Sequence, residues 1–216
     1  MSKSVTMHHD QADVVVRHYA RLAPAYDRIW DRYTRRSLAK LAASLPLSGH
    51  ERLLDVACGT GRLAVMIRQD HPGVRITGLD VSPAMIEVAR RRLPEDDATR
   101  WQVGMLSSVE LEPQSFDIVT CASAFHLFTD QDEGLAQMAR LVRPGGTVCI
   151  VDWCREYPQI RGIQALARLY GKQYRNILTR AELRAKASRA GLTVVSEERF
   201  RATWFWAMMC VVATRP

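Results

Sequence analysis

The chain has 216 residues and a mass of 24.4 kDa, which suits one α/β domain and leaves no room for a second catalytic domain. Hydrophobic residues make up 47% and charged residues 25%, which excludes a disordered chain, and no apolar run approaches the roughly 18 residues of a membrane span. The net charge of +7 alone does not choose between an anionic substrate, an acidic membrane surface and RNA. Because the arginines are scattered over several predicted helices, they favour solvated helix faces over a single nucleic-acid stripe.

The first ten residues lack the charged-then-apolar pattern of a signal peptide, so we expect a cytoplasmic protein. Five cysteines are present without C-x-x-C spacing, and most of them lie in apolar, strand-like segments. This pattern is typical of reduced thiols that act as small buried hydrophobic residues. No ligand spacing such as H-E-x-x-H predicts a metal site.

Residues 11 to about 45 are predicted to form two helices joined at Pro24. In the second helix, apolar side chains recur at helical spacing, at Leu38, Leu41, Ala42 and Leu45. We expect these helices to form a cap ahead of a sheet.

A strand is predicted at about 52–57, followed by a turn that contains Gly59 and Gly61 and by a helix over 60–69. The glycines can adopt positive φ and let the backbone approach a ligand closely, while the first turn of the helix offers unpaired N–H groups. This arrangement indicates a nucleotide-type cofactor at the end of the strand.

A second strand, at about 74–79, leads into Asp80. This acid comes about 20 residues after the glycines, the spacing of a carboxylate that binds ribose hydroxyls. Ser82-Pro83 then starts a helix in the order expected of an N-cap followed by proline. The third glycine of the dinucleotide fingerprint is absent, since Arg62-Leu63-Ala64 follows Gly61, and this weakens an interpretation as an NAD site.

Three further strands are expected at about 99–103, 116–121 and 147–151, and Arg143-Pro144-Gly145-Gly146 supplies a turn before the last of them. The alternation of strands and helices predicts a parallel, doubly wound α/β sheet.

The C-terminal part is predicted to hold one more helix and two strands. Thr179 and Glu182 have the spacing of a capping box, and Gly191 ends the helix that they start. The two strands are expected at 193–196 and 204–213.

From about Tyr19 onward, the chain resembles the class I S-adenosylmethionine (SAM)-dependent methyltransferase family, in particular its ubiquinone/menaquinone-biosynthesis-like small-molecule branch. The family's acid-x-Gly-x-Gly-x-Gly motif is matched by Asp55, Gly59 and Gly61, with Ala57 in place of the first glycine. The segment 143–146 resembles its Leu-x-Pro-Gly-Gly element.

The resemblance implies a Rossmann-like sheet of seven strands, the last antiparallel, with an N-terminal helical cap. It also implies one domain over residues 1–216. We divide this domain into a cap (10–45), a SAM-binding core (50–152), a substrate lid (153–180) and a C-terminal helix and strand pair (181–216).

The resemblance assigns Asp55 to the methionine part of SAM and Asp80 to the ribose hydroxyls, while Tyr19 and Tyr26 fold over the cofactor. A turn cap for Asp55, a helix N-terminal acid for Asp80 and core packing for Tyr26 are the structural alternatives. The other predicted cofactor neighbours lie in the glycine turn or at strand ends: Ala57, Cys58, Gly59, Gly61, Val81, Met85, Met105, Leu106 and Ala122.

Two departures from the family affect the predicted site. Met105 stands where an aspartate usually accepts a bond from the adenine amino group, so that contact must come from backbone, Ser107 or water. Of a family segment that ends in His-His-Leu, only the first histidine remains, as His126. His126 is a candidate general base or substrate orienter, and a structural histidine in the pocket wall is the alternative.

The resemblance implies SAM-dependent methyl transfer to a small-molecule acceptor, with S-adenosylhomocysteine as product and without a metal. The acceptor atom, N, O, S or C, and the oligomeric state are not determined by these residues. The predicted substrate-binding residues are the aromatic side chains of the lid: Trp153, Tyr157, Tyr170 and Tyr174.

Two alternatives to this function stay open. One is a methyltransferase for a quinone precursor or lipid headgroup, in peripheral contact with an anionic membrane. The other is a SAM-responsive binding protein without catalysis. We do not expect a nucleic-acid partner, because neither an Asn-Pro-Pro-Tyr-type motif nor a basic RNA-binding extension is present.

Overall fold

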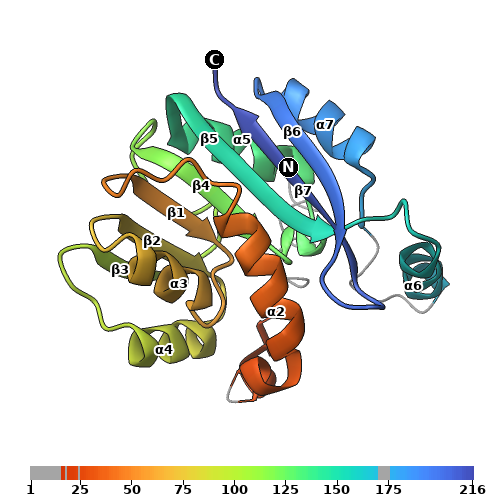
Figure 1. Cartoon of the computed structure of the whole chain (residues 1–216), viewed down its shortest axis with the longest axis horizontal. Helices are drawn as coiled ribbons and strands as arrows, with labels where there is room; N and C mark the ends of the chain where they lie inside the picture. The colour runs from red at the N-terminus through yellow and green to blue at the C-terminus, as the bar shows by residue number, and fades with distance from the viewer. Residues whose placement is uncertain (1–15, 18, 24, 170–175) are drawn as a thin grey trace, which may run out of the picture.

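A seven-stranded sheet forms the centre of the computed structural model, which describes residues 16–17, 19–23, 25–169 and 176–216 (Figure 1). The strand order is β3-β2-β1-β4-β5-β7-β6. The strands are β1 (Arg52–Val56), β2 (Arg75–Asp80), β3 (Thr99–Val103), β4 (Phe116–Ala122), β5 (Val142–Trp153), β6 (Thr193–Arg201) and β7 (Ala207–Thr214). The first five strands are parallel, and β7 runs antiparallel to both β5 and β6. The predicted fold class and antiparallel last strand are confirmed.

Helices cover the two faces of this sheet. They are α2 (Tyr26–Ala42), α3 (Arg62–Asp70), α4 (Pro83–Arg92), α5 (Gln131–Leu141), α6 (Pro158–Leu169) and α7 (Arg180–Arg189), with a short 3-10 turn, η1 (Phe125–Leu127). Helices α2, α3 and α4 pack in one buried cluster on one face, and α5 and α7 pack in a second cluster on the other (Figure 1). Residues 16–17 and 19–22 are also helical, just before α2.

The local signals in the sequence predict the starts of these elements well. Ser82 caps α4 through a bond from Met85 N to its Oγ, and Thr179 and Glu182 form the predicted capping box of α7. The segment 143–146 differs from the prediction. It is part of β5 rather than a turn before it, because Gly145 and Gly146 exchange backbone hydrogen bonds with Arg215. Likewise, β6 extends to Arg201, and residues 202–206 form the connection to β7.

The indole ring of Trp101 determines how β2, β3 and the start of α3 pack together. Its Nε1 donates to the Leu93 carbonyl oxygen at 2.9 Å, and the ring lies against two glycines. A Cβ atom would lie 2.3 Å from the ring at Gly78 and 2.7 Å from it at Gly61. Gly61 also has a φ of +73°. Glycine is therefore required there both by the close Trp101 ring and by the left-handed backbone conformation.

Gly59 and Gly61 provide a matched pair for testing these demands. Both have positive φ, but a Cβ at Gly59 would meet no atom within 4 Å. We expect Gly59→Ala to lower the free energy of unfolding by about 1–2 kcal/mol through backbone strain alone. Gly61→Ala should cost roughly 1–3 kcal/mol more because Trp101 must move. Urea unfolding of both variants checks this, and equal costs would contradict it.

Candidate active site

A cavity of about 570 Å³ opens at the carboxyl ends of β1, β2 and β4. Pockets for small molecules usually have about 300–1,000 Å³, so the size suits a cofactor or an organic substrate. Its position follows from the topology, because the strand order reverses between β1 and β4 and the following loops separate there. Ten of the predicted cofactor residues line it: Tyr19, Tyr26, Ala57, Gly59, Asp80, Val81, Met85, Met105, Leu106 and Ala122.

The chain leaves β1 through a turn with three residues in the left-handed region. These are Ala57 at φ +57°, Gly59 at φ +54° and Gly61 at φ +73°. Ala57 therefore keeps the conformation of the glycine it replaces, at a cost of about 1–2 kcal/mol for an L-residue. Ser123, which follows the neighbouring strand β4, also has positive φ, at +57°. Both strained residues line the cavity, where such strain usually marks a functional site.

Asp80 connects the glycine turn to the end of β2. One of its carboxylate oxygens accepts from Gly59 N at 2.9 Å and the other from Ser82 N at 2.8 Å. The side chain is buried, and this burial raises its pKa, although the two backbone donors oppose the shift. Each oxygen keeps a further lone pair, so this carboxylate can also accept bonds from two neighbouring hydroxyl groups in the cavity.

Asp55 lies behind the cavity rather than in its lining. It is 2% exposed, and Oδ1 accepts from the Thr120 hydroxyl at 2.9 Å. Burial raises its pKa to about 7, with a further rise from the nearby Asp80 charge, although the Thr120 bond lowers it. A positive charge entering the cavity would favour the ionised form. Cys58 and Gly61 also lie outside the lining, and they shape the turn from the core side.

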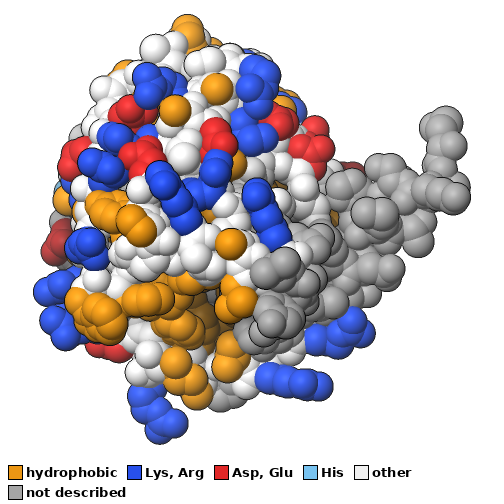
Figure 2. All heavy atoms as spheres, turned by 90° about the vertical axis from the view of Figure 1, so that its right-hand side faces the viewer, with side chains coloured by type: hydrophobic (Ala, Val, Ile, Leu, Met, Phe, Trp, Pro, Cys, Tyr) orange, Lys and Arg blue, Asp and Glu red, His pale blue; other side chains and the backbone are white. Residues whose placement is uncertain are grey.

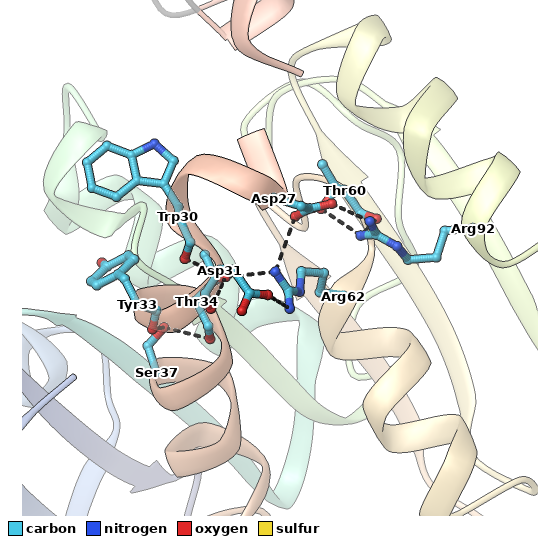
Figure 3. Close-up of polar contacts among 9 residues, drawn as sticks. All are labelled: Asp27, Trp30, Asp31, Tyr33, Thr34, Ser37, Thr60, Arg62 and Arg92. Atoms are coloured by element: carbon cyan, nitrogen blue, oxygen red, sulfur yellow. Dashed lines mark hydrogen bonds and ion pairs between the residues drawn. The ribbon is translucent and has the colours of Figure 1, made fainter. Parts of the chain in front are cut away.

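The start of α2 is attached to the glycine turn by a polar network around Asp27 (Figure 3). Asp27 Oδ1 accepts from the Thr60 hydroxyl at 2.9 Å and lies 3.7 Å from Arg62, and Oδ2 pairs with Arg92 from α4. Arg92 also donates to the Thr60 hydroxyl at 2.8 Å. The network thereby places the neighbouring Tyr26 in the cavity wall, 5.9 Å from the ring of Tyr19.

Asp31, one turn later in α2, extends this connection to α3. It pairs with Arg62 at 2.7 Å, and the same guanidinium donates to the Thr34 hydroxyl at 3.1 Å (Figure 3). The cap is therefore held to α3 and α4 by two acids one turn apart.

The wall opposite the cap comes from segments that the sequence analysis did not single out. Leu127 ends η1, Phe128, Thr129 and Asp130 follow it, and Gly134 belongs to α5. A Cβ at Gly134 would lie 2.6 Å from the Phe128 ring, so this glycine lets the ring pack against α5. Their place in the cavity could have been predicted from the sequence. They come directly after β4, and the carboxyl ends of parallel strands share one edge of a sheet. Ser107 and Ser108 line the cavity beside Met105.

His126 is buried beside the cavity and forms a pair with Asp152 at the end of β5. Its Nδ1 lies 2.7 Å from Asp152 Oδ1, and its backbone N–H donates to Asp152 Oδ2 at 2.6 Å. Trp153 is also outside the lining. Its ring stacks on His126 at 4.4 Å, and its Nε1 donates to the Tyr33 hydroxyl at 2.8 Å.

Of the predicted substrate residues, the two that the structure describes, Trp153 and Tyr157, do not line the cavity. Tyr157 lies beyond the lining, where the guanidinium groups of Arg199 and Arg201 cover its ring at 5.5 and 5.2 Å. Tyr170 and Tyr174 fall outside the described residues. Within the described part of the chain, no group of three or more His, Cys, Asp or Glu side chains is arranged to hold a metal ion.

Comparison with known proteins identifies similar chains. A family model described as a methyltransferase domain matches residues 53–146. The chain is 34% identical over 149 residues to a demethylmenaquinone methyltransferase of Deinococcus radiodurans, covering 67% of this chain and 62% of the relative. It is 30% identical over 171 residues to a 27-O-demethylrifamycin SV methyltransferase of Amycolatopsis mediterranei, covering 76% and 62%. The chain thus spans less than two thirds of the length of these curated relatives.

A solved structure has the same fold over nearly the whole chain. It is a chain of the complex between the Haloferax volcanii Trm112 methyltransferase activator and a methyltransferase. The TM-score is 0.78 at 20% identity, covering 92% of this chain and 97% of the other.

The raised pKa of Asp55 predicts how the stability of the ligand-free protein depends on pH. Because the folded-state pKa of about 7 exceeds the unfolded value of about 3.9, folding favours the protonated carboxyl. Its stabilising effect is complete below about pH 4 and is lost as the pH rises through 7, a change on the order of a few kcal/mol.

The variant Asp55→Asn should remove this contribution, since an amide oxygen still accepts from Thr120 but does not ionise. The free energy of unfolding of Asp55→Asn minus that of the wild type should therefore increase between pH 5 and 8. Denaturant titrations across this range measure the difference, and a value independent of pH would contradict the assignment.

Proposed function

We propose that the chain is a class I SAM-dependent methyltransferase that uses SAM as its cofactor and transfers a methyl group to a small-molecule acceptor, in line with the methyltransferase family model and the methyltransferase relatives. The observation that carries the proposal is the convergence of the glycine turn, Asp80 and the capping tyrosines on one cavity. SAM supplies a methyl group that its positively charged sulfur has already activated. The chain's part is then to bind, to align the acceptor and to exclude water.

The residues present fit this cofactor at each end of the cavity. The free lone pairs of Asp80 suit the two ribose hydroxyls, and Val81, Met85, Met105 and Leu106 suit the flat adenine ring through apolar packing. Ser107 offers a hydroxyl near the adenine, where the family's aspartate is missing. Ala57, Ala122 and the buried carboxyl group of Asp55, whose ionised form a cation favours, suit the cationic methionine end.

Tyr19 and Tyr26 are proposed to close the cavity over the sulfonium. Both rings line the cavity, and an aromatic face attracts a cation by about 0.5–2 kcal/mol, depending on its exposure. The Asp27 network holds Tyr26 in that position before any ligand binds, so little ordering cost remains for this side chain.

For the acceptor, we propose an apolar, ring-shaped molecule of the quinone-precursor type. Ala124, Leu127 and Phe128 give the wall opposite the cap an apolar part, beside Thr129 and Asp130, and this part suits a flat apolar ring. The names of the relatives support a quinone-type acceptor, since one of them is a demethylmenaquinone methyltransferase.

His126 was predicted as a general base or substrate orienter, with a structural histidine in the pocket wall as the alternative, and its burial outside the cavity lining supports the alternative. Asp152 accepts from the backbone N–H of His126 and hydrogen-bonds its ring Nδ1, and it thereby fixes η1, from which Leu127 and the following Phe128 enter the cavity wall. We propose His126 and Asp152 as positioning residues for this wall.

A peripheral position at an anionic membrane is the second candidate, and one surface feature favours it. Trp204 is 84% exposed in the β6–β7 connection, next to Phe205, and Leu166 of α6 is 57% exposed. Gln159 of α6 donates to the Phe205 carbonyl oxygen at 3.2 Å, so the two elements adjoin. Figure 2 shows hydrophobic side chains gathered on this side of the molecule with Lys and Arg around them, the pattern of a protein that lies on a bilayer.

In the described part of the chain, no helix is both long and apolar enough to cross a membrane.

Residues 153–180 remain our proposed lid, and α6 is a helix within it. The cytoplasm remains our proposed location, in agreement with five buried cysteines that are all free.

Transfer of labelled methyl groups tests the proposed function. We expect the protein to move label from methyl-labelled SAM to a reduced prenylated naphthoquinone. The label should be recovered in the organic phase in amounts exceeding the enzyme. Saturable SAM binding without product from any quinol, phenol, thiol or amine would contradict catalysis and leave a SAM-responsive binding protein.

The same assay separates the two candidate settings. With the acceptor embedded in anionic vesicles, Trp204→Ser should lower the rate about tenfold if the protein works at a membrane, because an interfacial anchor is lost. With the acceptor in detergent, the rate should stay within twofold. Equal rates for both proteins in vesicles would exclude Trp204 as an anchor.

A further inference from the structure

Three arginines form a second candidate site at the opposite, amino end of β1, β2 and β3. Arg52, Arg75 and Arg100 line a hollow of about 430 Å³ together with Thr77, Asp97 and Phe116. Strands of this length span roughly 16–20 Å, so the hollow is separated from the cavity at the carboxyl ends by the length of the sheet.

The register of the strands places the three arginines on one face. Arg52 is the direct partner of Arg75, and Arg100 is the partner of Thr77, two residues further along β2. Partners in a parallel sheet point to the same side, as do residues two apart in one strand. Leu54 and Leu79 continue this face and are fully buried in the cluster that contains α5 and α7.

The face is exposed at the three arginines, although the chain returns along the sheet from the carboxyl end of β3 to the amino end of β4. Residues 104–115 connect β3 to β4 without a helix, and Leu106, Val109 and Leu111 of this segment pack over the buried half of the face. Parallel sheets are normally covered on both faces and carry apolar residues there. Exposed arginines on this part of the sheet therefore call for an explanation other than core formation.

Stability does not explain the cluster. Like charges directly opposite each other on neighbouring strands repel, and strands there are only about 4.8 Å apart. None of the three guanidinium groups has an ion-pair partner in the described part of the chain, whereas Arg62, Arg92 and Arg143 elsewhere each pair with an aspartate. The guanidinium group of Arg52 lies over the Phe116 ring, 5.8 Å from its centroid.

The nearby carboxylates leave the arginines unneutralised. Asp117 accepts from Arg143 and from the backbone N–H of Arg52, and Glu51 accepts from the backbone N–H groups of Ser48 and Gly49. Asp97 is the single carboxylate among the described residues of the lining, so the hollow keeps an excess of positive charge.

We propose that this hollow binds a small molecule that carries two or more linked phosphate groups. The planar guanidinium fork matches phosphate oxygens bidentately, and three forks on adjacent strands suit a short chain of phosphates better than one ion. Thr77 adds a hydroxyl donor in the same lining. A long nucleic acid fits less well, because the acids Glu51, Asp97 and Asp117 surround the cluster and would repel an extended backbone.

Binding of inorganic tripolyphosphate, measured by calorimetry, tests the proposal. Orthophosphate is the single-phosphate control, and ATP tests whether the source can be a nucleotide. We expect saturable binding of tripolyphosphate and ATP, and at least tenfold weaker binding of orthophosphate. Arg75→Gln should weaken tripolyphosphate binding about tenfold or more, since it removes the central fork. The matched control Arg91→Gln loses the same charge from the exposed side of α4 and should change binding less than twofold.

A stability readout distinguishes a binding role from a structural one. Arg75→Gln should raise the melting temperature of the ligand-free protein, because it relieves repulsion with Arg52. It should also lose most of the upward shift that tripolyphosphate produces in the wild type, while SAM binding stays unchanged. Absence of tripolyphosphate binding by the wild type, or equal losses in Arg75→Gln and Arg91→Gln, would overturn the proposal. RNA binding through these arginines without tripolyphosphate binding would also overturn it.

Discussion

The site depends on the attachment of the N-terminal cap to the glycine turn through Asp27. The carboxyl edge of the sheet supplies the floor of the cavity, but the wall above it comes from a helix that precedes the sheet in sequence. Asp27 accepts from Thr60 in the turn and pairs with Arg92 of α4. Both charged side chains are about a quarter exposed, so the pair alone contributes little to stability. Its effect is geometric, because it ties three elements together at the point where Tyr26 enters the cavity wall.

Several features of the cavity lower the stability of the ligand-free protein. Asp55 and Asp80 lie buried near each other, and burial raises the pKa of both. Ala57 and Ser123 hold positive φ on neighbouring strand ends. A cationic ligand reverses the first of these costs, since its charge favours the ionised carboxylates. The strained turns let the backbone come close to that ligand, so the same features that weaken the empty protein suit it to bind SAM.

The sequence predicted those parts of the site that depend on local chemistry. The strands, the glycine turn, Asp80 and the caps at Ser82 and Thr179 are each encoded within a few residues. The aromatic residues of the proposed lid were harder to place, because a side chain's surroundings depend on distant elements. Trp153 stacks on His126 and bonds Tyr33, and Tyr157 packs under Arg199 and Arg201. The same limit hid the arginine hollow, because only the register of β1 and β2 brings Arg52 beside Arg75.

Equilibrium binding of SAM, S-adenosylhomocysteine and NAD to the wild type and to Asp80→Asn tests the central claim most directly. The account predicts saturable binding of SAM and its product and weaker binding of NAD. It also predicts a loss of roughly tenfold or more in SAM affinity for Asp80→Asn, because an amide replaces one of the two oxygens that accept from the ribose hydroxyls. No SAM binding by the wild type, or unchanged SAM affinity in Asp80→Asn, would contradict it.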